Sequence, residues 1–173
     1  MSFNTKKIFL ILCIIVPFLF YCFYYYGMIL RDAPFKFKEF KSFSIQYGTG
    51  DSLLNKYNSA TGDYQYLNKR DSLVKTHMLL TKSDMLVLHQ KAANLGFWDF
   101  PSDERNSDTS HLHGAKPPRY IIEYNYLHTS KKVIFDANYL GPQKLVDANL
   151  QMVKEIQAVL AGAEARQKRP VSL

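Results

Sequence analysis

Cysteine is scarce in this sequence, because Cys13 and Cys22 are the only two and both lie within one apolar run. The rest of the chain therefore has no disulfide framework and no thiol chemistry. The turn Gly48-Thr49-Gly50 lacks the Walker lysine pattern and the dinucleotide-binding spacing, so we interpret it as a hairpin turn. The net charge of +7 is spread out, without a recognition motif, and we expect neither nucleic-acid binding nor a small-molecule cofactor.

Residues 8–30 form an uncharged apolar run, long enough to cross a hydrocarbon core of about 30 Å. Three interpretations compete for it. A cleaved signal peptide would need a small-residue cleavage site, which is missing. A lipoprotein signal would acylate Cys22, but the bulky Phe20 and Tyr21 directly precede it. We favour the third interpretation, an uncleaved signal-anchor that crosses the membrane once and follows a short basic tail, residues 1–7.

The orientation of this span depends on which basic residues are counted. Lys6 and Lys7 favour an N-terminus inside the cell, whereas the basic residues that follow the span favour the opposite orientation. Those residues are Arg31, Lys36, Lys38 and Lys41. Since a short basic tail before an apolar run resembles an export signal, we predict an inner-membrane protein whose C-terminal domain faces the periplasm or the outside.

The stretch 81–101 predicts one amphipathic helix with a signal at each end. Thr81 is a suitable N-cap with Asp84 three residues later, and Gly96 suits a left-handed C-cap. Its apolar stripe is Met85, Leu88, Ala92 and Leu95, widened by Leu86 and Ala93. We expect the aromatic residues after it to fill the core, with a ligand-stacking role for Trp98 as the alternative.

Alternating apolar and polar residues predict strands on both sides of this helix. The expected strands cover residues 43–47, 53–57, 64–66, 74–80, 119–127 and 132–136. A second helix begins at Pro142, with Leu145, Ala148, Met152, Val153, Ile156, Val159 and Leu160 as its stripe. We predict an α+β fold in which an antiparallel sheet carries both helices on one face. A juxtamembrane stalk (31–41) leads to this single domain (42–162), and a flexible basic tail (163–173) follows.

The polar stretch 102–118 is the least regular part of the sequence, and it contains the clustered metal-type ligands. These are Asp103, Glu104, Asp108, His111 and His113. His111 and His113, with Asp108, are weak candidates for a zinc site, because the spacing specifies no complete ligand set. We therefore predict no metal site and no catalytic residues, and keep a metal-dependent hydrolase as an alternative.

The order of these elements resembles that of bacterial exported or membrane-anchored small α+β domains of unknown function. The resemblance rests on Phe97-Trp98-Asp99-Phe100-Pro101 and on Tyr120-Ile121-Ile122-Glu123, and it covers roughly residues 43–160. It departs at residues 111–114, where an Asp-Gly turn is expected. The resemblance implies the fold and an envelope location, and it implies no activity.

We therefore expect a non-enzymatic, membrane-anchored envelope protein that binds another macromolecule, most simply a protein partner. The binding surface is predicted at residues 102–118 and the adjoining sheet edge, since function concentrates on loops held by a scaffold. An inhibitor or immunity-type protein that binds a toxin or a hydrolase is the alternative. It predicts that such a partner co-purifies with the chain.

Overall fold

The computed structural model describes residues 3–32, 35–106 and 116–168, which belong to two compact units, Met1–Pro34 and Phe35–Leu173. The first unit is one helix, α1 (Phe3–Asp32), and its segment Lys7–Tyr26 is long and apolar enough to cross a membrane. Large apolar side chains along this helix, such as Ile11 and Phe18, are exposed. Among the described residues α1 is the one helix with these properties.

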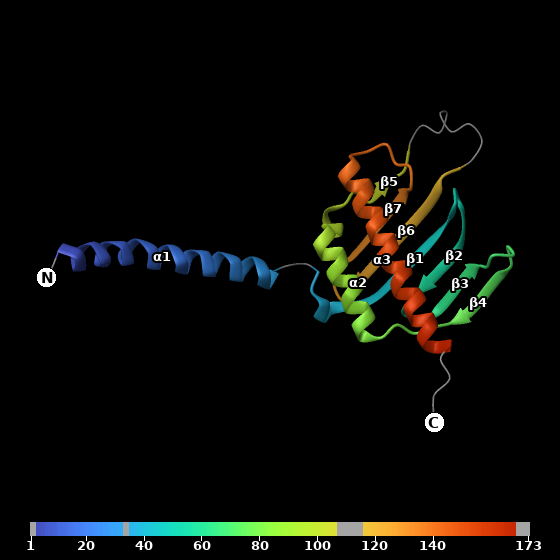
Figure 1. Ribbon diagram of the computed structural model, residues 1–173, viewed down its shortest axis with the longest axis horizontal. Coiled ribbons are helices and arrows are strands. Elements are labelled where there is room, and N and C mark those ends of the chain that lie inside the picture. The colour runs from blue at the N-terminus through green and yellow to red at the C-terminus, as the bar shows by residue number, and fades with distance from the viewer. Residues whose placement is uncertain (1–2, 33–34, 107–115, 169–173) are drawn as a thin grey trace, which may run out of the picture. The chain divides into compact units, whose positions relative to one another are not determined.

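The second unit is built on a seven-stranded sheet with the order β4-β3-β2-β1-β6-β7-β5 (Figure 1). The strands are β1 (Phe40–Thr49), β2 (Ser52–Asn58), β3 (Asp63–Leu67), β4 (Leu73–His77), β5 (Asp103–Glu104), β6 (Pro118–Tyr126) and β7 (Ser130–Asp136). All neighbours pair antiparallel except β5, which runs parallel to β7. The predicted α+β class is therefore confirmed, with one short parallel strand added at an edge.

Two helices, α2 (Lys82–Leu95) and α3 (Gln143–Lys168), lie side by side on one face of this sheet (Figure 1). The apolar members of the strand alternation point toward them and form the core. The fully buried side chains include Phe43 and Ile45 of β1, Ile122 and Tyr124 of β6, and Leu88 of α2. Both predicted stripes therefore face the sheet, although Leu86 and Ala93 of α2 are exposed.

The ends of α2 follow the predicted local chemistry. Thr81 and Asp84 form a reciprocal capping box, in which each side chain accepts a hydrogen bond from the other residue's backbone N–H. Gly96 ends the helix in the left-handed region, at φ 72°. A short 3-10 helix, η2 (Phe97–Asp99), then carries the aromatic residues into the core, where Phe97 is buried and Trp98 is half-buried.

The folded unit extends beyond the predicted domain boundaries at both ends. It begins at Phe35 rather than near Ser42, because Phe35 and Phe40 pack on the core from either side of the 3-10 helix η1 (Phe37–Glu39). Residues 35–41, predicted as stalk, therefore belong to the domain. At the other end α3 continues through Gly162 to Lys168, into the predicted flexible tail.

Specific contacts explain the longer α3 and a shorter fourth strand. Arg166 pairs with Asp84 at 2.5 Å, and the Gln167 side chain donates to the His77 carbonyl at 2.8 Å, so the last turn is held in place. The fourth strand, predicted to reach residue 80, ends at His77. There the N–H of Met78 donates to the carbonyl of Gly62, and the Met78 side chain is buried.

Candidate functional site

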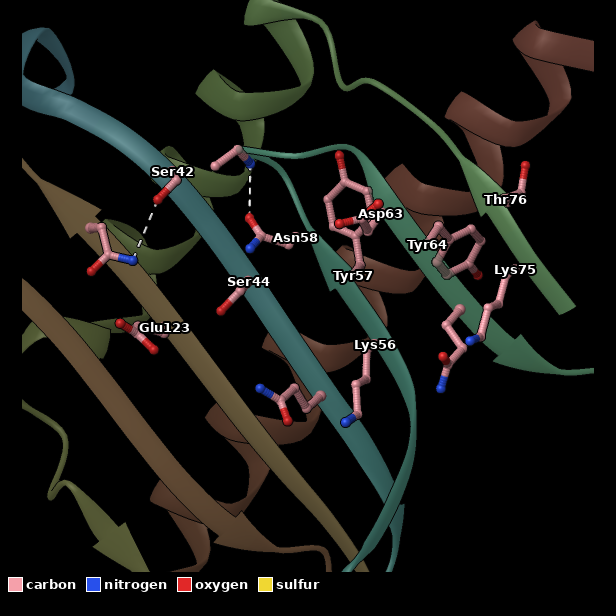
Figure 2. Close-up of a pocket in the computed structure, with 14 residues that line it drawn as sticks. Ser42, Ser44, Lys56, Tyr57, Asn58, Asp63, Tyr64, Lys75, Thr76 and Glu123 are labelled. Atoms are coloured by element: carbon pink, nitrogen blue, oxygen red, sulfur yellow. Dashed lines mark hydrogen bonds between the residues drawn. The ribbon is translucent and has the colours of Figure 1, made fainter. Parts of the chain in front are cut away.

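The sheet face that α2 and α3 leave uncovered, called the open face below, carries a groove of about 680 Å³. Figure 2 looks onto this face with helices behind the strands. The lining comes from β1, β2, β3, β4 and β6 and from the turn between β2 and β3, and it is mostly polar. Its polar side chains include Ser42, Ser44, Gln46, Lys56, Asn58, Asp63, Gln65, Lys75, Glu123 and Asn125.

The strand register arranges these side chains in two rows across the sheet. One row runs Glu123, Ser44, Asn58, Asp63 and His77, from β6 to β4. The next row runs Ile121, Gln46, Lys56, Gln65 and Lys75 over the same strands. Because neighbouring rows lie two residues apart along each strand, they are separated by roughly 7 Å. The groove thus has an acidic row beside a lysine row.

The charged side chains of the groove have few partners of their own. Lys56, Lys75 and Glu123 make no side-chain hydrogen bond or ion pair with any residue that the structure describes, whereas Asp63 accepts one from Thr61 at 2.6 Å. The amide of Gln65 donates to the Leu54 carbonyl at 2.7 Å. Three of the four charges are therefore available to a ligand without breaking an interaction inside the described domain.

Two tyrosines at the side of the groove keep their phenols neutral. Burial raises the pKa of Tyr57 and of Tyr64 to about 12. The Tyr57 hydroxyl is occupied, because it donates to the Met78 carbonyl at 3.3 Å. With hydroxyls, carboxamides and charges of both signs, the groove can both donate and accept hydrogen bonds.

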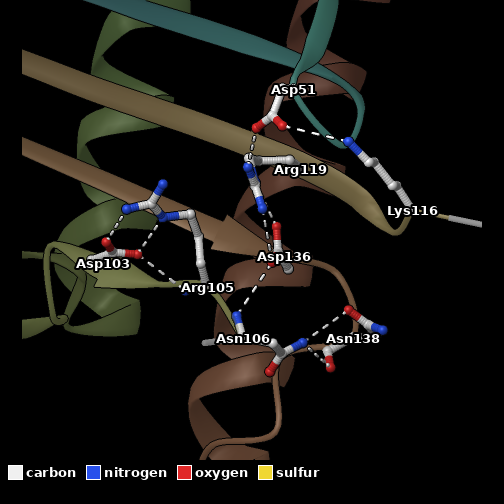
Figure 3. Close-up of polar contacts among 8 residues, drawn as sticks. All are labelled: Asp51, Asp103, Arg105, Asn106, Lys116, Arg119, Asp136 and Asn138. Atoms are coloured by element: carbon white, nitrogen blue, oxygen red, sulfur yellow. Dashed lines mark hydrogen bonds and ion pairs between the residues drawn. The ribbon is translucent and has the colours of Figure 1, made fainter. Parts of the chain in front are cut away.

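A second polar cluster lies around Arg119 at the start of β6 (Figure 3). The Arg119 guanidinium binds Asp136 of β7 through two hydrogen bonds, of 2.7 and 3.2 Å, and also pairs with Asp51. Asp136 is buried and also accepts a hydrogen bond from the backbone N–H of Asn106. The hydrogen bonds to Asp136 are the main cause that raises the pKa of Arg119. The cluster holds both described ends of the 102–118 stretch against the sheet, because Asn106 contacts Asp136 and Lys116 pairs with Asp51.

Of the five metal-type ligands named from the sequence, the structure describes two, Asp103 and Glu104, and their side chains have different partners. Asp103 points to Arg105 and binds it, whereas Glu104 is fully buried beside Asn149 of α3. The weak candidates Asp108, His111 and His113 lie outside the described residues. Among the residues that are described, no three histidine, cysteine, aspartate or glutamate side chains come together in a way that fits a metal ion.

Trp98, for which ligand stacking was the alternative, already has an aromatic partner. Its ring stacks on Phe35 with centroids 4.6 Å apart and meets Tyr124 and Tyr126 edge-on. His89 joins the same cluster, where its Nδ1 lies 2.8 Å from the Tyr126 hydroxyl and burial lowers its pKa. This arrangement makes Trp98 part of the packing between the start of the domain and α2.

The binding surface predicted at residues 102–118 and the adjoining sheet edge can be placed only in part. The described ends of that stretch belong to the Arg119 cluster. The sheet edge next to the stretch is the short strand β5, which pairs with β7. The open-face groove was missed from the sequence, since its members come from five separate strands. The sequence does contain one indication, the polar residues that alternate with apolar ones along each strand. This alternation shows which side chains of a strand lie on an uncovered face, but it does not show which strands lie next to each other.

Comparison with known proteins adds no assignment. No protein-family model matches the chain, and no curated protein matches its sequence.

Proposed function

We propose that this chain is a membrane-anchored protein whose open face binds a protein partner. The observation that carries the proposal is the groove of about 680 Å³, in which Lys56, Lys75 and Glu123 have no side-chain partner among the described residues. Charged groups of this kind attract a surface of complementary charge during association and select against partners of the wrong charge. The groove therefore fits a polar surface segment that carries charges of both signs.

The rows of the groove specify how such a segment would lie. Acidic side chains of the partner would face Lys56 and Lys75, and basic side chains would face Glu123 and Asp63, about 7 Å away. Ser44, Asn58 and Gln65 lie between these charges and supply hydrogen bonds. Complementary charges would mainly accelerate association and exclude wrong partners, while the amides and hydroxyls would fix the register.

The location that we propose is the bacterial inner membrane, with the domain in the periplasm or outside. The support is α1, whose segment Lys7–Tyr26 can cross a membrane, together with the short basic tail that precedes it. Labelling of a single cysteine introduced at Lys154, with Cys13 and Cys22 replaced by serine, tests the orientation. A reagent that cannot cross the membrane should label intact cells or spheroplasts, and labelling only after lysis would reverse the orientation.

The binding proposal is tested by site-specific photo-crosslinking in the native membrane. A photoreactive residue at Gln46, inside the groove, should give a defined crosslinked species, and one at Lys154, on the exposed side of α3, should not. Identification of the crosslinked protein would also decide the class of partner. A toxin or a hydrolase would make this chain an inhibitor or immunity-type protein.

Charge reversal then links the crosslink to the groove. Lys56→Glu with Lys75→Glu should abolish the Gln46 crosslink while leaving the melting temperature nearly unchanged, because both side chains are exposed. Lys154→Glu, the same reversal on the helix side, should leave the crosslink intact. A crosslink that survives the double reversal, or one lost equally in the control, would move the binding surface away from the open face.

A further inference from the structure

Glu104 of β5 and Asn149 of α3 face each other inside the core. Glu104 is 0% exposed and Asn149 is 1% exposed. The amide nitrogen Nδ2 of Asn149 donates to Glu104 Oε2 at 2.5 Å. The other oxygen of each side chain, Glu104 Oε1 and Asn149 Oδ1, is buried without a hydrogen-bond partner among the described residues.

Two unpartnered oxygens on neighbouring side chains cannot satisfy each other, because both are acceptors when Glu104 is ionised. A single proton on Oε1 changes this, since the carboxylic acid then has one donor to offer to Asn149 Oδ1. The acid and the amide would form a cyclic pair with two hydrogen bonds, and neither orphaned oxygen would remain. Leaving such atoms unpaired in the core costs free energy, so the protonated pair is the favoured one.

We propose that Glu104 and Asn149 share this proton near neutral pH and act as a pH-sensitive latch between β5 and α3. The proposal is independent of the binding function proposed above. Release of the proton would leave a buried carboxylate and weaken the hold of α3 on the edge strand. Asn106, two residues after Glu104, makes contacts with Asp136, Asn138 and Leu140, so the latch secures the strand that precedes this network.

The charged groups around the pair do not replace the proton. From β7, Lys131 favours the carboxylate, but its ammonium donates to the carbonyl of Phe100. From α3 the contact is the neutral Asn149. On β5 itself, Asp103 is bound to Arg105, and both side chains are about half exposed. Burial is the largest influence, and it raises the pKa of Glu104 from 4.5 to about 7 against the opposing effects of Asn149 and Lys131.

The direction of the pH dependence follows from these values. In the unfolded chain glutamate titrates near 4.5, so between about 4.5 and about 7 only the folded state holds the proton. The latch is fully present below pH 4.5, and its contribution is lost as the pH rises through about 7. Above about 7 both states are ionised and the loss levels off.

The test compares Glu104→Gln with the wild-type chain, both full-length in detergent micelles. Glutamine has the donor and the acceptor of the protonated acid and cannot titrate. The ratio of the wild-type and E104Q unfolding constants should therefore rise with pH, by up to tenfold per pH unit between about 5 and 7. Glu155→Gln makes the same substitution on the surface of α3, where Glu155 lies 3.8 Å from Lys91, and should reproduce the wild-type profile.

Infrared spectroscopy gives a second readout that does not depend on a variant's folding. Wild-type protein at pH 6 should show the C=O stretch of a protonated, buried carboxyl group, which should disappear above pH 8. E104Q, where it folds, should lack this band. A wild-type spectrum without a protonated carboxyl at pH 6, or parallel pH profiles for wild type and E104Q, would overturn the latch.

Discussion

Replacing Asp136 by asparagine should destabilise the domain strongly, because Asp136 is the buried partner of Arg119. The Asp136 side chain is 1% exposed, and it holds the guanidinium through two hydrogen bonds while accepting a third from the N–H of Asn106. Asparagine keeps the size of the side chain but removes its charge. The guanidinium, itself 16% exposed, would then retain Asp51 as its one counter-charge among the described residues.

The expected magnitude comes from the difference between buried and exposed ion pairs. Removing one member of a buried pair costs about 3 to 5 kcal/mol, because the remaining charge stays desolvated. Residual contact with Asp51 places Asp136→Asn near the lower limit, at about 3 kcal/mol. Against a typical total stability of about 5 to 15 kcal/mol, this is a large fraction and corresponds to a melting temperature roughly 10 °C lower.

Asp51 supplies the matched control, since it pairs with the same arginine but is 77% exposed. Asp51→Asn should cost less than about 1 kcal/mol, as exposed ion pairs do. Urea unfolding followed by circular dichroism, on full-length protein in detergent, measures both variants. Equal losses for the two variants would refute the reasoning, because burial would then have no influence on the value of the pair.

Removing both partners provides a further check on the same reasoning. A double variant, Arg119→Met with Asp136→Leu, leaves no buried charge, so it should be less destabilised than the sum of its single variants. Strict additivity would mean that the two side chains act independently, contrary to the geometry.

Three further predictions concern the packing, the helix cap and the anchor. Trp98→Ala should lower the free energy of unfolding in urea by about 2 kcal/mol, because the side chain is half-buried against Phe35. A fully buried ring would cost roughly 3 to 5 kcal/mol. No measurable loss would show that the ring lies outside the packing. Thr81→Ala should cost about 1 kcal/mol of stability, and Thr81→Ser much less, because serine keeps the hydroxyl oxygen that accepts a hydrogen bond from the Asp84 N–H. Similar losses for the two variants would exclude the cap as the cause. The intact mass of the membrane-extracted protein should include α1, whereas an acylated form beginning at Cys22 would contradict the signal-anchor.

The elements predictable from the sequence are those whose signals are local. Thr81 and Gly96 mark the two ends of α2 through backbone chemistry that neighbouring residues determine, and the structure confirms both ends. The end of α3 was not predictable in this way. Gly162 weakens a helix locally, but the contacts of Arg166 and Gln167 with distant residues extend it, and no local pattern shows such contacts.

The buried pair could have been suspected from one position. Asn149 falls on the apolar stripe of α3, close to Leu145 and Met152, and a polar side chain there needs a buried partner. The identity of that partner was not predictable, because Glu104 lies in a polar stretch that suggests solvent exposure. Its burial follows from the parallel pairing of β5 with β7, a long-range contact that no periodicity announces.

The open face shows why a groove of this kind escapes sequence reasoning although each of the five strands that line it is predictable. Alternation places Gln46, Lys56 and Lys75 on polar sides of their strands, and each alone is typical of a solvated position. Their alignment in one row depends on the register that pairs β1 with β2, β2 with β3, and β3 with β4. A shift of one residue in any of these pairings would turn a strand's polar side chains toward the helices. The buried residues Ile45 and Tyr57, by preventing that shift, determine where the charges of the groove lie.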